Sequence, residues 1–306
     1  MENLFDTKVG IITRTVYRPI FFSRLIESIS SQTFRDFMWI IVDDEGGEKE
    51  KREKLFSRQI EQLSNDGIKV KLIINETNKG RPESANIGLR SVNSQYAVLH
   101  DDDDSWEPSF LEKTAAFLDN NEDYVGVTTH MYRVDEKIEG SRVRKISSHV
   151  CNARIKNVTI ARMCQRNLFS PISFLFRKKA FDIIDGFDSN MPVLEDYDFF
   201  LRLLLEGDIG VIQQPLANHH YRWEQHEDTK YDNTVTTGIN EHHKVYAEYI
   251  NMKLRQDIKN QCISLGHVLA MGEMLSDTTN LFERLYPIKN RAKKIKNSIK
   301  KLLFIK

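Results

Sequence analysis

Apolar runs alternate with amphipathic segments along the first hundred residues. Short runs of β-type residues predict strands at 9–13, 37–42, 70–74 and 96–99. Helical spacing of apolar residues predicts helices at 18–30, 45–65 and 83–92, and places Leu55, Ile60 and Leu63 on the inward face of the second. This order predicts an α/β fold, in which a mostly parallel central sheet carries helices on both faces.

The second half of the chain has a less regular pattern. It predicts strands at 125–133 and 173–176 and helices at 178–184 and 195–206. After Pro215 we expect a loop rich in histidine and tryptophan, followed by helical sequence to about residue 274. The organisation expected is an α/β domain over 1–225 and a helical C-terminal region over 226–306.

Composition narrows the class of protein. The 306 residues are 40% hydrophobic, which is enough for a sizeable core, and Lys+Arg and Asp+Glu both total 44, so net charge indicates no nucleic-acid partner. Three scattered cysteines are too few for a disulfide framework and favour a reducing compartment. The chain shows neither a secretory signal nor an apolar stretch that could cross a bilayer, so we expect a cytoplasmic protein.

The last 19 residues, 288–306, form a basic tail. They contain seven lysines and one arginine, with no acidic residue, and their apolar residues recur at helical spacing. This pattern is typical of an interfacial helix that binds anionic lipid, which predicts a peripheral position at the inner face of the membrane. A terminal helix that is solvated or bound to a partner is the alternative.

Four consecutive aspartates, Asp101 to Asp104, follow the apolar run at 96–99. In open α/β sheets, ligands bind at the carboxyl ends of the strands. Adjacent carboxylates repel one another, and their hard oxygen atoms select Mg²⁺ or Mn²⁺, ions that commonly bind the phosphates of a substrate. A solvated acidic turn is the other interpretation of such a run. Glycine-rich dinucleotide and P-loop motifs are absent from the sequence.

The motifs of residues 8–225 occur in the order found in a known family. The sequence resembles the inverting nucleotide-sugar glycosyltransferases of family 2, which have the GT-A fold. The resemblance is carried by Ile12-Thr13-Arg14-Thr15 with Arg18-Pro19, Ser31-Gln32-Thr33, Ile41-Val42-Asp43-Asp44, Asn78-Lys79-Gly80-Arg81 with Ala85-Asn86-Ile87-Gly88, Asp101–Asp104 with Trp106 and Pro108, Gly186-Phe187-Asp188, and Glu195-Asp196-Tyr197-Asp198 with Leu201-Arg202.

The resemblance implies roles for residues near the first three strands. Thr13 and Arg14 would meet the nucleotide at the end of the first strand. Asp43 would accept a hydrogen bond from N3–H of the base, which suits uracil and predicts a UDP-sugar donor. Arg81 would donate charge-assisted hydrogen bonds to the diphosphate.

Within the aspartate run, the resemblance places the family's Asp-x-Asp (DXD) pair on Asp101 and Asp103. Asp103 would be the direct ligand of Mn²⁺ or Mg²⁺, and Asp101 or Asp102 would face the ribose or the sugar. Asp104 would cap the following helix or hold a metal-bound water.

A late histidine sometimes completes the metal site in related enzymes. His226 and His219 are the candidates in this chain. Many relatives have histidine at the position of Glu224, so the sequence departs from the family pattern here. Trp223 would stack on a sugar ring or pack in the fold.

Asp196 is expected to be the general base. A single inversion needs one carboxylate to take the proton of the attacking hydroxyl, whereas double displacement needs a separate nucleophile. The expected function is an inverting, metal-dependent hexosyl transfer (EC 2.4) to a saccharide or lipid-linked saccharide in cell-surface polysaccharide synthesis. The alternatives are a nucleotidyltransferase of similar fold and an inactive module that binds sugar nucleotides.

Overall fold

The computed structural model describes residues 5–191, 193–222, 231, 239–260, 266–267 and 269–273. The chain divides into two compact units, one formed by 1–160 with 167–246 and the other by 161–166 with 247–306. Most of helix α9 (Ile239–Asn260) belongs to the second unit. Within the described ranges, no helix combines the length and apolar character that crossing a membrane requires.

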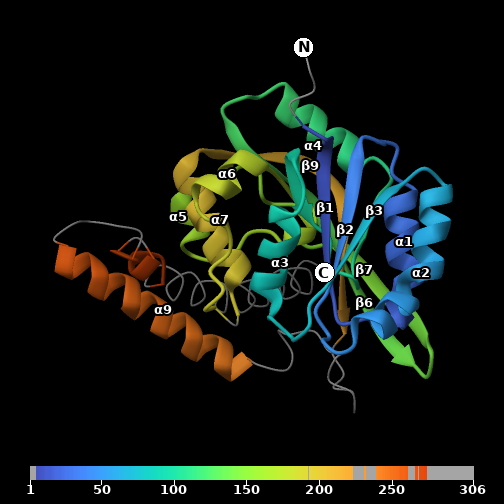
Figure 1. The fold of residues 1–306 in the computed structure, drawn as a ribbon. Coiled ribbons are helices and arrows are strands. Elements are labelled where there is room, and N and C mark those ends of the chain that lie inside the picture. Colours follow the sequence, from blue (N-terminus) through green and yellow to red (C-terminus); the bar gives the residue numbers. More distant parts are fainter. Residues whose placement is uncertain are drawn as a thin grey trace, which may run out of the picture. The chain divides into compact units, whose positions relative to one another are not determined.

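The first unit is an α/β structure in which short helices follow most strands (Figure 1). Its elements are β1 (Thr7–Thr15), α1 (Pro19–Ser30), β2 (Phe37–Asp43), α2 (Lys49–Asn65), β3 (Lys69–Ile74), α3 (Arg81–Arg90), β4 (Ser94–Leu99), β5 (Ser105–Trp106), α4 (Phe110–Asp119), β6 (Tyr124–Glu139), β7 (Arg142–Val150), a 3₁₀ turn (Pro171–Ser173), β8 (Phe174–Arg177), α6 (Lys178–Ile183), α7 (Glu195–Glu206) and β9 (Asp208–Arg222). The short helix α5 (Ile160–Met163) lies at the boundary of the two units.

Nine strands of the described chain form one sheet, in the order β3-β2-β1-β4-β8-β6-β9-β5, with β7 paired to β6. The first four strands in this order are parallel to one another. In the second half β8 is antiparallel to both β4 and β6, while β6 and β9 run parallel. The predicted α/β class is confirmed, and the parallel strands β1, β2 and β4 end at one common edge.

Alternating residues of the parallel strands face opposite helical layers. Ile11 and Trp39 belong to the core that includes Phe56 of α2 and the apolar face of α1. On the other face, Ile12 lies so close to Gly88 of α3 that any side chain at Gly88 would collide with it. Figure 1 shows α1 and α2 on one side of β1 and β2, and α3 on the other. Period-two alternation in a strand buried on both faces explains this arrangement.

Two details of the predicted helices and strands are wrong. Leu55 of α2 does not face inward, since 37% of it is exposed, whereas the adjacent Phe56 is fully buried. Phe56 is spaced four and seven residues from Ile60 and Leu63, so it shares their helical face. The predicted strand at 125–133 is also too short, because β6 continues to Glu139 and pairs with β7, which the pattern did not indicate.

Up to Arg222, where the described range 193–222 ends, the loop expected after Pro215 is instead part of strand β9. This strand runs from Asp208 to Arg222 beside β6, and its register shifts where Pro215 lies opposite His130. Proline cannot donate a ladder hydrogen bond, and a register irregularity is where a sheet tolerates it. The strand therefore carries His219, His220 and Arg222 along the sheet.

Candidate active site

The four aspartates lie at the carboxyl ends of the parallel strands. They follow β4, and the backbone N–H of the preceding residue, His100, donates to the carbonyl of Ile12 in β1 at 2.9 Å. Asp102, Asp103 and Asp104 are buried, and Asp101 is half-buried. Buried carboxylates are costly unless other groups compensate their charge, so the surrounding cations decide what this site can do.

Three arginines from different parts of the chain compensate these carboxylates. Arg14 Nη2 donates to Asp101 Oδ1 at 2.7 Å. Arg18 pairs with Asp102 and also lies 3.1 Å from Asp103 Oδ1. The fully buried Arg222, at the end of β9, pairs with Asp103 Oδ2. We refer to these six residues (Arg14, Arg18, Arg222, Asp101, Asp102 and Asp103) as the arginine–aspartate cluster.

The cluster separates the pKa values of neighbouring aspartates. Burial alone would raise the pKa of Asp103, but the charges of Arg18 and Arg222 outweigh burial and hold it well below its usual range. The pKa of Asp104 is raised well above its usual range, because it is buried and lies next to the charge of Asp103. Asp103 is therefore held ionised, and so is Asp101, because the charge of Arg14 lowers its pKa against the effect of burial.

Asp102 and Asp104 have structural hydrogen bonds. Asp102 Oδ2 accepts from Thr15 Oγ1 at 2.6 Å, in addition to its pairing with Arg18, so Asp101 is the more open of the two residues expected at the ribose or sugar. Asp104 Oδ1 accepts from the backbone N–H of His220 at 2.8 Å. The expectation that Asp104 caps the next helix is wrong, because Ser109 occupies the N-cap position of α4.

A buried glutamate on β6 extends the cluster. Glu136 Oε1 accepts from Arg222 Nη1 at 2.8 Å, and its Oε2 accepts from Arg24 Nη1 at 2.9 Å and contacts His220 Nδ1 at 2.9 Å. Burial would raise the pKa of Glu136, but its hydrogen bond to His220 and the charge of Arg24 lower it to about 2. Sequence reasoning missed Glu136, Arg24 and Arg222, because their roles depend on pairing between distant segments.

The N-terminus of α7 brings two more carboxylates to the same place. Leu194 adopts a left-handed backbone conformation (φ 63°) immediately before the helix, a strained conformation for a residue with a side chain. Glu195 Oε1 lies 3.5 Å from Arg14 Nη1, and its two oxygens lie 3.0 and 3.1 Å from Arg81 Nη2. Arg14 therefore joins Asp101 of the cluster to the start of α7.

Asp196, the residue after Glu195, has an environment suited to proton transfer. Its Oδ2 accepts from Asn167 Nδ2 at 3.2 Å. Burial and the adjacent charge of Glu195 raise the pKa of Asp196 to about 6, against the opposing charges of Arg81 and Arg14. A carboxylate with this pKa is unprotonated at neutral pH and is a stronger base than an ordinary aspartate.

Arg81 is placed at the first position of α3 by the preceding loop. The carboxylate of Asp44 accepts from the backbone N–H groups of Lys79 and Gly80, at 2.7 and 2.9 Å. Gly80 has φ of 85°, which favours glycine, and it turns the chain into the helix. The Arg81 side chain is 44% exposed although it is paired with Glu195, so it can also meet a ligand.

Two residues expected to contact the nucleotide have other partners. The Thr13 side chain lies in the core, where its hydroxyl accepts from Trp39 Nε1 at 3.0 Å, so the structure does not bring it to the cluster. Asp43, at the end of β2, is fully buried and both of its oxygens bind Arg52, each at 2.6 Å. A base could reach Asp43 only after a shift of Arg52.

The donor atoms near the cluster fit a metal ion that is shared with a substrate. Asp101 and Asp103 have the hard oxygen atoms that Mg²⁺ and Mn²⁺ prefer, and an ion at Asp103 would have to share or displace its contacts with Arg18 and Arg222. In the described chain, no three His, Cys, Asp or Glu side chains converge to hold an ion by themselves. Such an ion would therefore take its other ligands from phosphates and water, which is the usual coordination of Mg²⁺.

The structure describes one of the two candidate histidines, His219. Burial lowers the pKa of His219 to about 4, although the charges of Asp103 and Asp101 oppose the shift. A neutral imidazole is the form that binds metals, so His219 stays a candidate ligand. His226 lies outside the described residues, as do Trp223, Glu224 and the basic tail at 288–306.

Comparison with known proteins shows the family to which the chain belongs. The family model described as "Glycosyl transferase family 2" matches residues 11–184, more than half of the chain. An uncharacterized glycosyltransferase of Haemophilus influenzae is 25% identical over 303 residues, which cover 97% of this chain and 95% of the relative.

Solved structures share the fold. TarS 1-349 of S. aureus in complex with UDP-GlcNAc aligns with a TM-score of 0.63 and 20% identity, over 87% of this chain and 71% of that one. The mannosyltransferase PcManGT of Pyrobaculum calidifontis, in complex with GDP-Man and Mn²⁺, aligns with a TM-score of 0.53 and 13% identity, over 71% of this chain and 60% of that one. At this level of identity the likeness shows the fold, and the structure found here is of the GT-A type.

Proposed function

Because this chain belongs to glycosyl transferase family 2, we propose that it moves a sugar, with inversion, from a UDP-sugar to a hydroxyl group of an acceptor saccharide. One observation carries the proposal. Arg14 binds both Asp101, beside the predicted metal ligand, and Glu195, beside the predicted base. This contact supports a site in which the residues proposed to hold the donor lie beside the residue next to the proposed base, Asp196.

The donor's diphosphate would bind where the cations gather. Arg81 is partly exposed and Arg14 lies beside it, with Arg14 Nη1 3.4 Å from the carbonyl oxygen of Arg81. Guanidinium groups donate paired hydrogen bonds to phosphate oxygens, so these two arginines would orient the leaving group. Asp101, the most open of the aspartates in the cluster, would accept hydrogen bonds from the ribose or the sugar.

A metal ion fits the same place. When bound to Asp103, with His219 as a possible neighbour, Mn²⁺ or Mg²⁺ would act as a Lewis acid that neutralises charge on the departing nucleoside diphosphate. PcManGT was solved with Mn²⁺ and a sugar nucleotide, and this supports a metal ion in the proposed reaction. The residues proposed to hold the ion come from the present structure alone. Arg18 and Arg222 would keep Asp103 ionised.

Asp196 would act on the acceptor. Its carboxylate would take the proton of the acceptor hydroxyl as that oxygen bonds to the anomeric carbon and the bond from this carbon to the diphosphate breaks. One displacement from the opposite face inverts the anomeric centre. Asn167 would orient the carboxylate through the 3.2 Å hydrogen bond to Oδ2.

The last parts of the proposal concern recognition of the nucleobase and the identity of the biological acceptor. Uracil would bind at the end of β2 after Arg52, which now occupies both oxygens of Asp43, shifts aside. The solved complex of TarS with UDP-GlcNAc supports a UDP-sugar donor. We place the reaction in cell-surface polysaccharide synthesis, with a saccharide or lipid-linked saccharide as acceptor and with the basic tail at 288–306 holding the enzyme to an anionic membrane.

Donor binding is the first test. UDP with Mn²⁺ should raise the melting temperature of the wild type, because a ligand that binds only the folded state stabilises it. A screen of nucleotide sugars for Mn²⁺-dependent hydrolysis would then identify the donor. If no nucleotide sugar is hydrolysed and UDP gives no stabilisation, the chain is not an active transferase of this type.

A further inference from the structure

A long segment of this chain contains no acidic residue. Between Glu139 and Asp182, the 42 residues 140–181 include ten Lys and Arg and no Asp or Glu. The whole chain has equal numbers of basic and acidic residues, so this segment is a local concentration of positive charge. The catalytic roles proposed above use none of its basic side chains.

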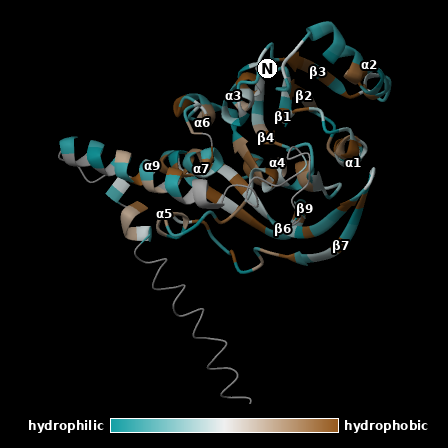
Figure 2. Cartoon of the chain, turned by 90° about the horizontal axis from the view of Figure 1, so that it is seen from below, coloured by the Kyte–Doolittle hydropathy of each residue, from teal (hydrophilic) through white to brown (hydrophobic). Residues whose placement is uncertain are grey.

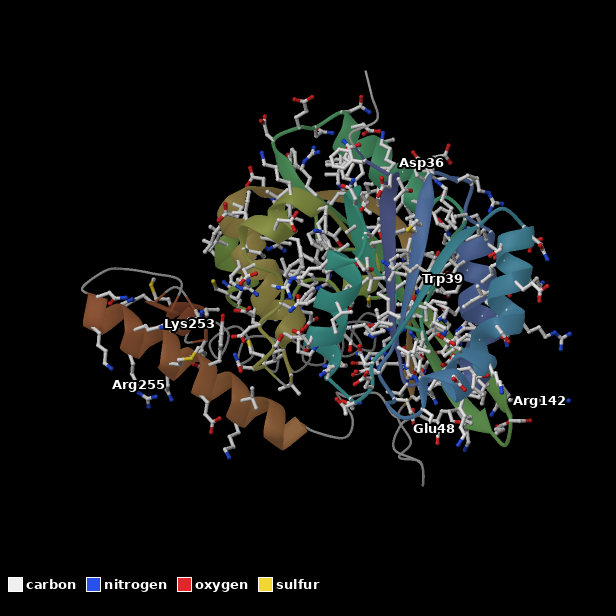
Figure 3. The ribbon with its side chains drawn as sticks, in the orientation of Figure 1. Asp36, Trp39, Glu48, Arg142, Lys253 and Arg255 are labelled. Atoms are coloured by element: carbon white, nitrogen blue, oxygen red, sulfur yellow. The ribbon has the colours of Figure 1, made fainter. Side chains whose placement is uncertain are left out.

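The first half of this segment forms the margin of the sheet. Strand β7 pairs with β6 and, among the described strands, with no other. Most side chains of β7 are exposed, and Figure 2 shows this strand at the margin with mainly hydrophilic residues. Figure 3 shows Arg142 at the outer end of the β6–β7 hairpin, pointing outward.

Residues 142–156 of this segment include four basic side chains without an acidic partner in the described part of the chain. Arg144 is paired with Glu139 at 2.9 Å and is therefore neutralised. The other Lys and Arg residues of 142–156 are exposed and form no ion pair in the described part of the chain: Arg142, Lys145, Arg154 and Lys156. We call these four residues the basic margin.

Protection of an edge strand does not account for the basic margin. Lysine on an exposed edge discourages pairing with other chains, which would explain Lys145. Arg154 and Lys156, however, lie beyond the end of β7, where there is no strand to protect. Their charge requires a different explanation.

The segment follows β6 over a long distance. Arg142 lies opposite Glu139, and further along the carbonyl of Ile155 contacts His130 Nε2 at 2.8 Å. The intervening part of β6, from Glu139 to His130, is nine residue steps, or about 30 Å for an extended strand. This length could accommodate several sugar units.

The basic margin also adjoins the candidate active site. Lys145 lies opposite Glu136 in the β6–β7 register. Glu136 binds Arg222, which in turn pairs with Asp103. A chain bound along the margin would therefore lie close to the arginine–aspartate cluster.

We propose that the basic margin binds anionic groups of the acceptor, so that the acceptor is a glycan bearing carboxylate or phosphate groups. This inference rests on the proposed transferase function. Complementary charge is the argument for this occupant, since the margin presents unpaired cations along an extended strand. A membrane surface is less suited to it, because Ile146, 53% exposed, is the one large apolar side chain of β7 among the exposed hydrophobic residues.

The test removes the four charges together. The variant carries Arg142→Gln, Lys145→Gln, Arg154→Gln and Lys156→Gln. The matched control removes the same number of charges from exposed positions elsewhere in the first unit, as Arg35→Gln, Lys49→Gln, Lys54→Gln and Arg58→Gln. Binding of a labelled alginate oligosaccharide, which is anionic, and of a neutral dextran oligosaccharide is measured by fluorescence anisotropy at low and physiological salt.

The wild type should bind alginate more tightly than dextran, and salt should weaken this binding. The margin variant should lose about tenfold in affinity for alginate, as expected for four contacts of surface-ion-pair strength, and the control should keep its affinity. The basic tail is present in every protein, so the difference between variant and control reports the margin. Equal binding of alginate by the margin variant and the wild type would overturn the proposal, as would equal binding of alginate and dextran by the wild type.

Two further measurements distinguish a failure of the acceptor proposal from a failure of the proposed transferase function. UDP with Mn²⁺ should stabilise wild type, margin variant and control alike, since none of the changed residues belongs to the proposed donor site. Loss of that stabilisation in the wild type would count against the proposed function rather than against the basic margin. Binding to vesicles containing phosphatidylglycerol should be equal for variant and control; a selective loss in the variant would assign the margin to a membrane and contradict the acceptor proposal.

Discussion

The carboxylates of Asp101 and Glu195 bind the same guanidinium group. Arg14 Nη2 lies 2.7 Å from Asp101 Oδ1, and Arg14 Nη1 lies 3.5 Å from Glu195 Oε1. Asp101 follows a strand and Glu195 begins a helix, so one buried arginine ties two distant segments together. The charge of Arg14 also lowers the pKa of Asp196, so the same guanidinium group acts on both segments.

Replacement of the proposed base should separate binding from transfer. Asp196→Asn keeps the shape of the side chain and its contact with Asn167 but removes the proton acceptor. We expect kcat for transfer to fall by about 10²–10⁴-fold, the usual contribution of a general base. Stabilisation by UDP and Mn²⁺ in a thermal shift assay should be retained. Transfer at the wild-type rate would reject Asp196 as the base.

The rate of transfer should depend on pH through Asp196. Its pKa is raised to about 6, chiefly by burial, and the base acts only when unprotonated. The kcat should therefore rise with pH up to about 6 and level off above about 7, whereas an ordinary aspartate would give a limb near 4. A pH profile of kcat under saturating donor and acceptor checks this expectation. A profile that is flat down to about pH 5 would contradict it.

Glu195→Gln should change both the pH profile and donor binding. The negative charge of Glu195 raises the pKa of Asp196, so its removal should move the acidic limb of kcat to lower pH. Arg14 and Arg81 also lose their shared partner, which should raise the KM for the donor. Glu206→Gln is the matched control, because Glu206 is an exposed acid at the other end of α7. An unchanged limb with an unchanged KM would mean that Glu195 has no positioning role.

Asp103→Asn should affect stability and metal-dependent binding together. The fully buried Arg222 would keep Glu136 but lose a charged partner, which should cost about 1–3 kcal/mol of the free energy of unfolding. The Mn²⁺-dependent part of the stabilisation by UDP should disappear when each protein is compared with its own ligand-free melting temperature. If Mn²⁺ still enhances UDP binding in the variant, Asp103 is not the principal metal ligand.

Thr13→Val tests the position of Thr13 in the core. The variant is nearly isosteric but leaves the buried Trp39 Nε1 without its acceptor, which should cost about 1–3 kcal/mol of the free energy of unfolding. The KM for the donor should not change, because the side chain does not reach the cluster. Urea denaturation and donor kinetics provide the two measurements. A large rise in KM at unchanged stability would restore Thr13 to the nucleotide site.

Local pattern accounts for much of the fold. The helix predicted at 195–206 has the bounds observed for α7, and the strands near 37–42 and 70–74 differ from β2 and β3 by one residue. These elements follow from short-range periodicity, which depends on neighbouring residues alone. The strand through Pro215 and the hairpin of β6 with β7 were not predicted, because their pairing depends on partners far away in the chain.

By itself the sequence determined the order of the elements, the position of the aspartates after a strand and the motifs of the family. It could not show which cation neutralises which carboxylate. Arg222 reaches Asp103 because β9 lies beside β6, and Arg14 reaches Glu195 because the start of α7 lies near the end of β1. Burial and charge pairing act through space, so only the tertiary structure decided that Asp103 is held ionised while Asp196 is made more basic.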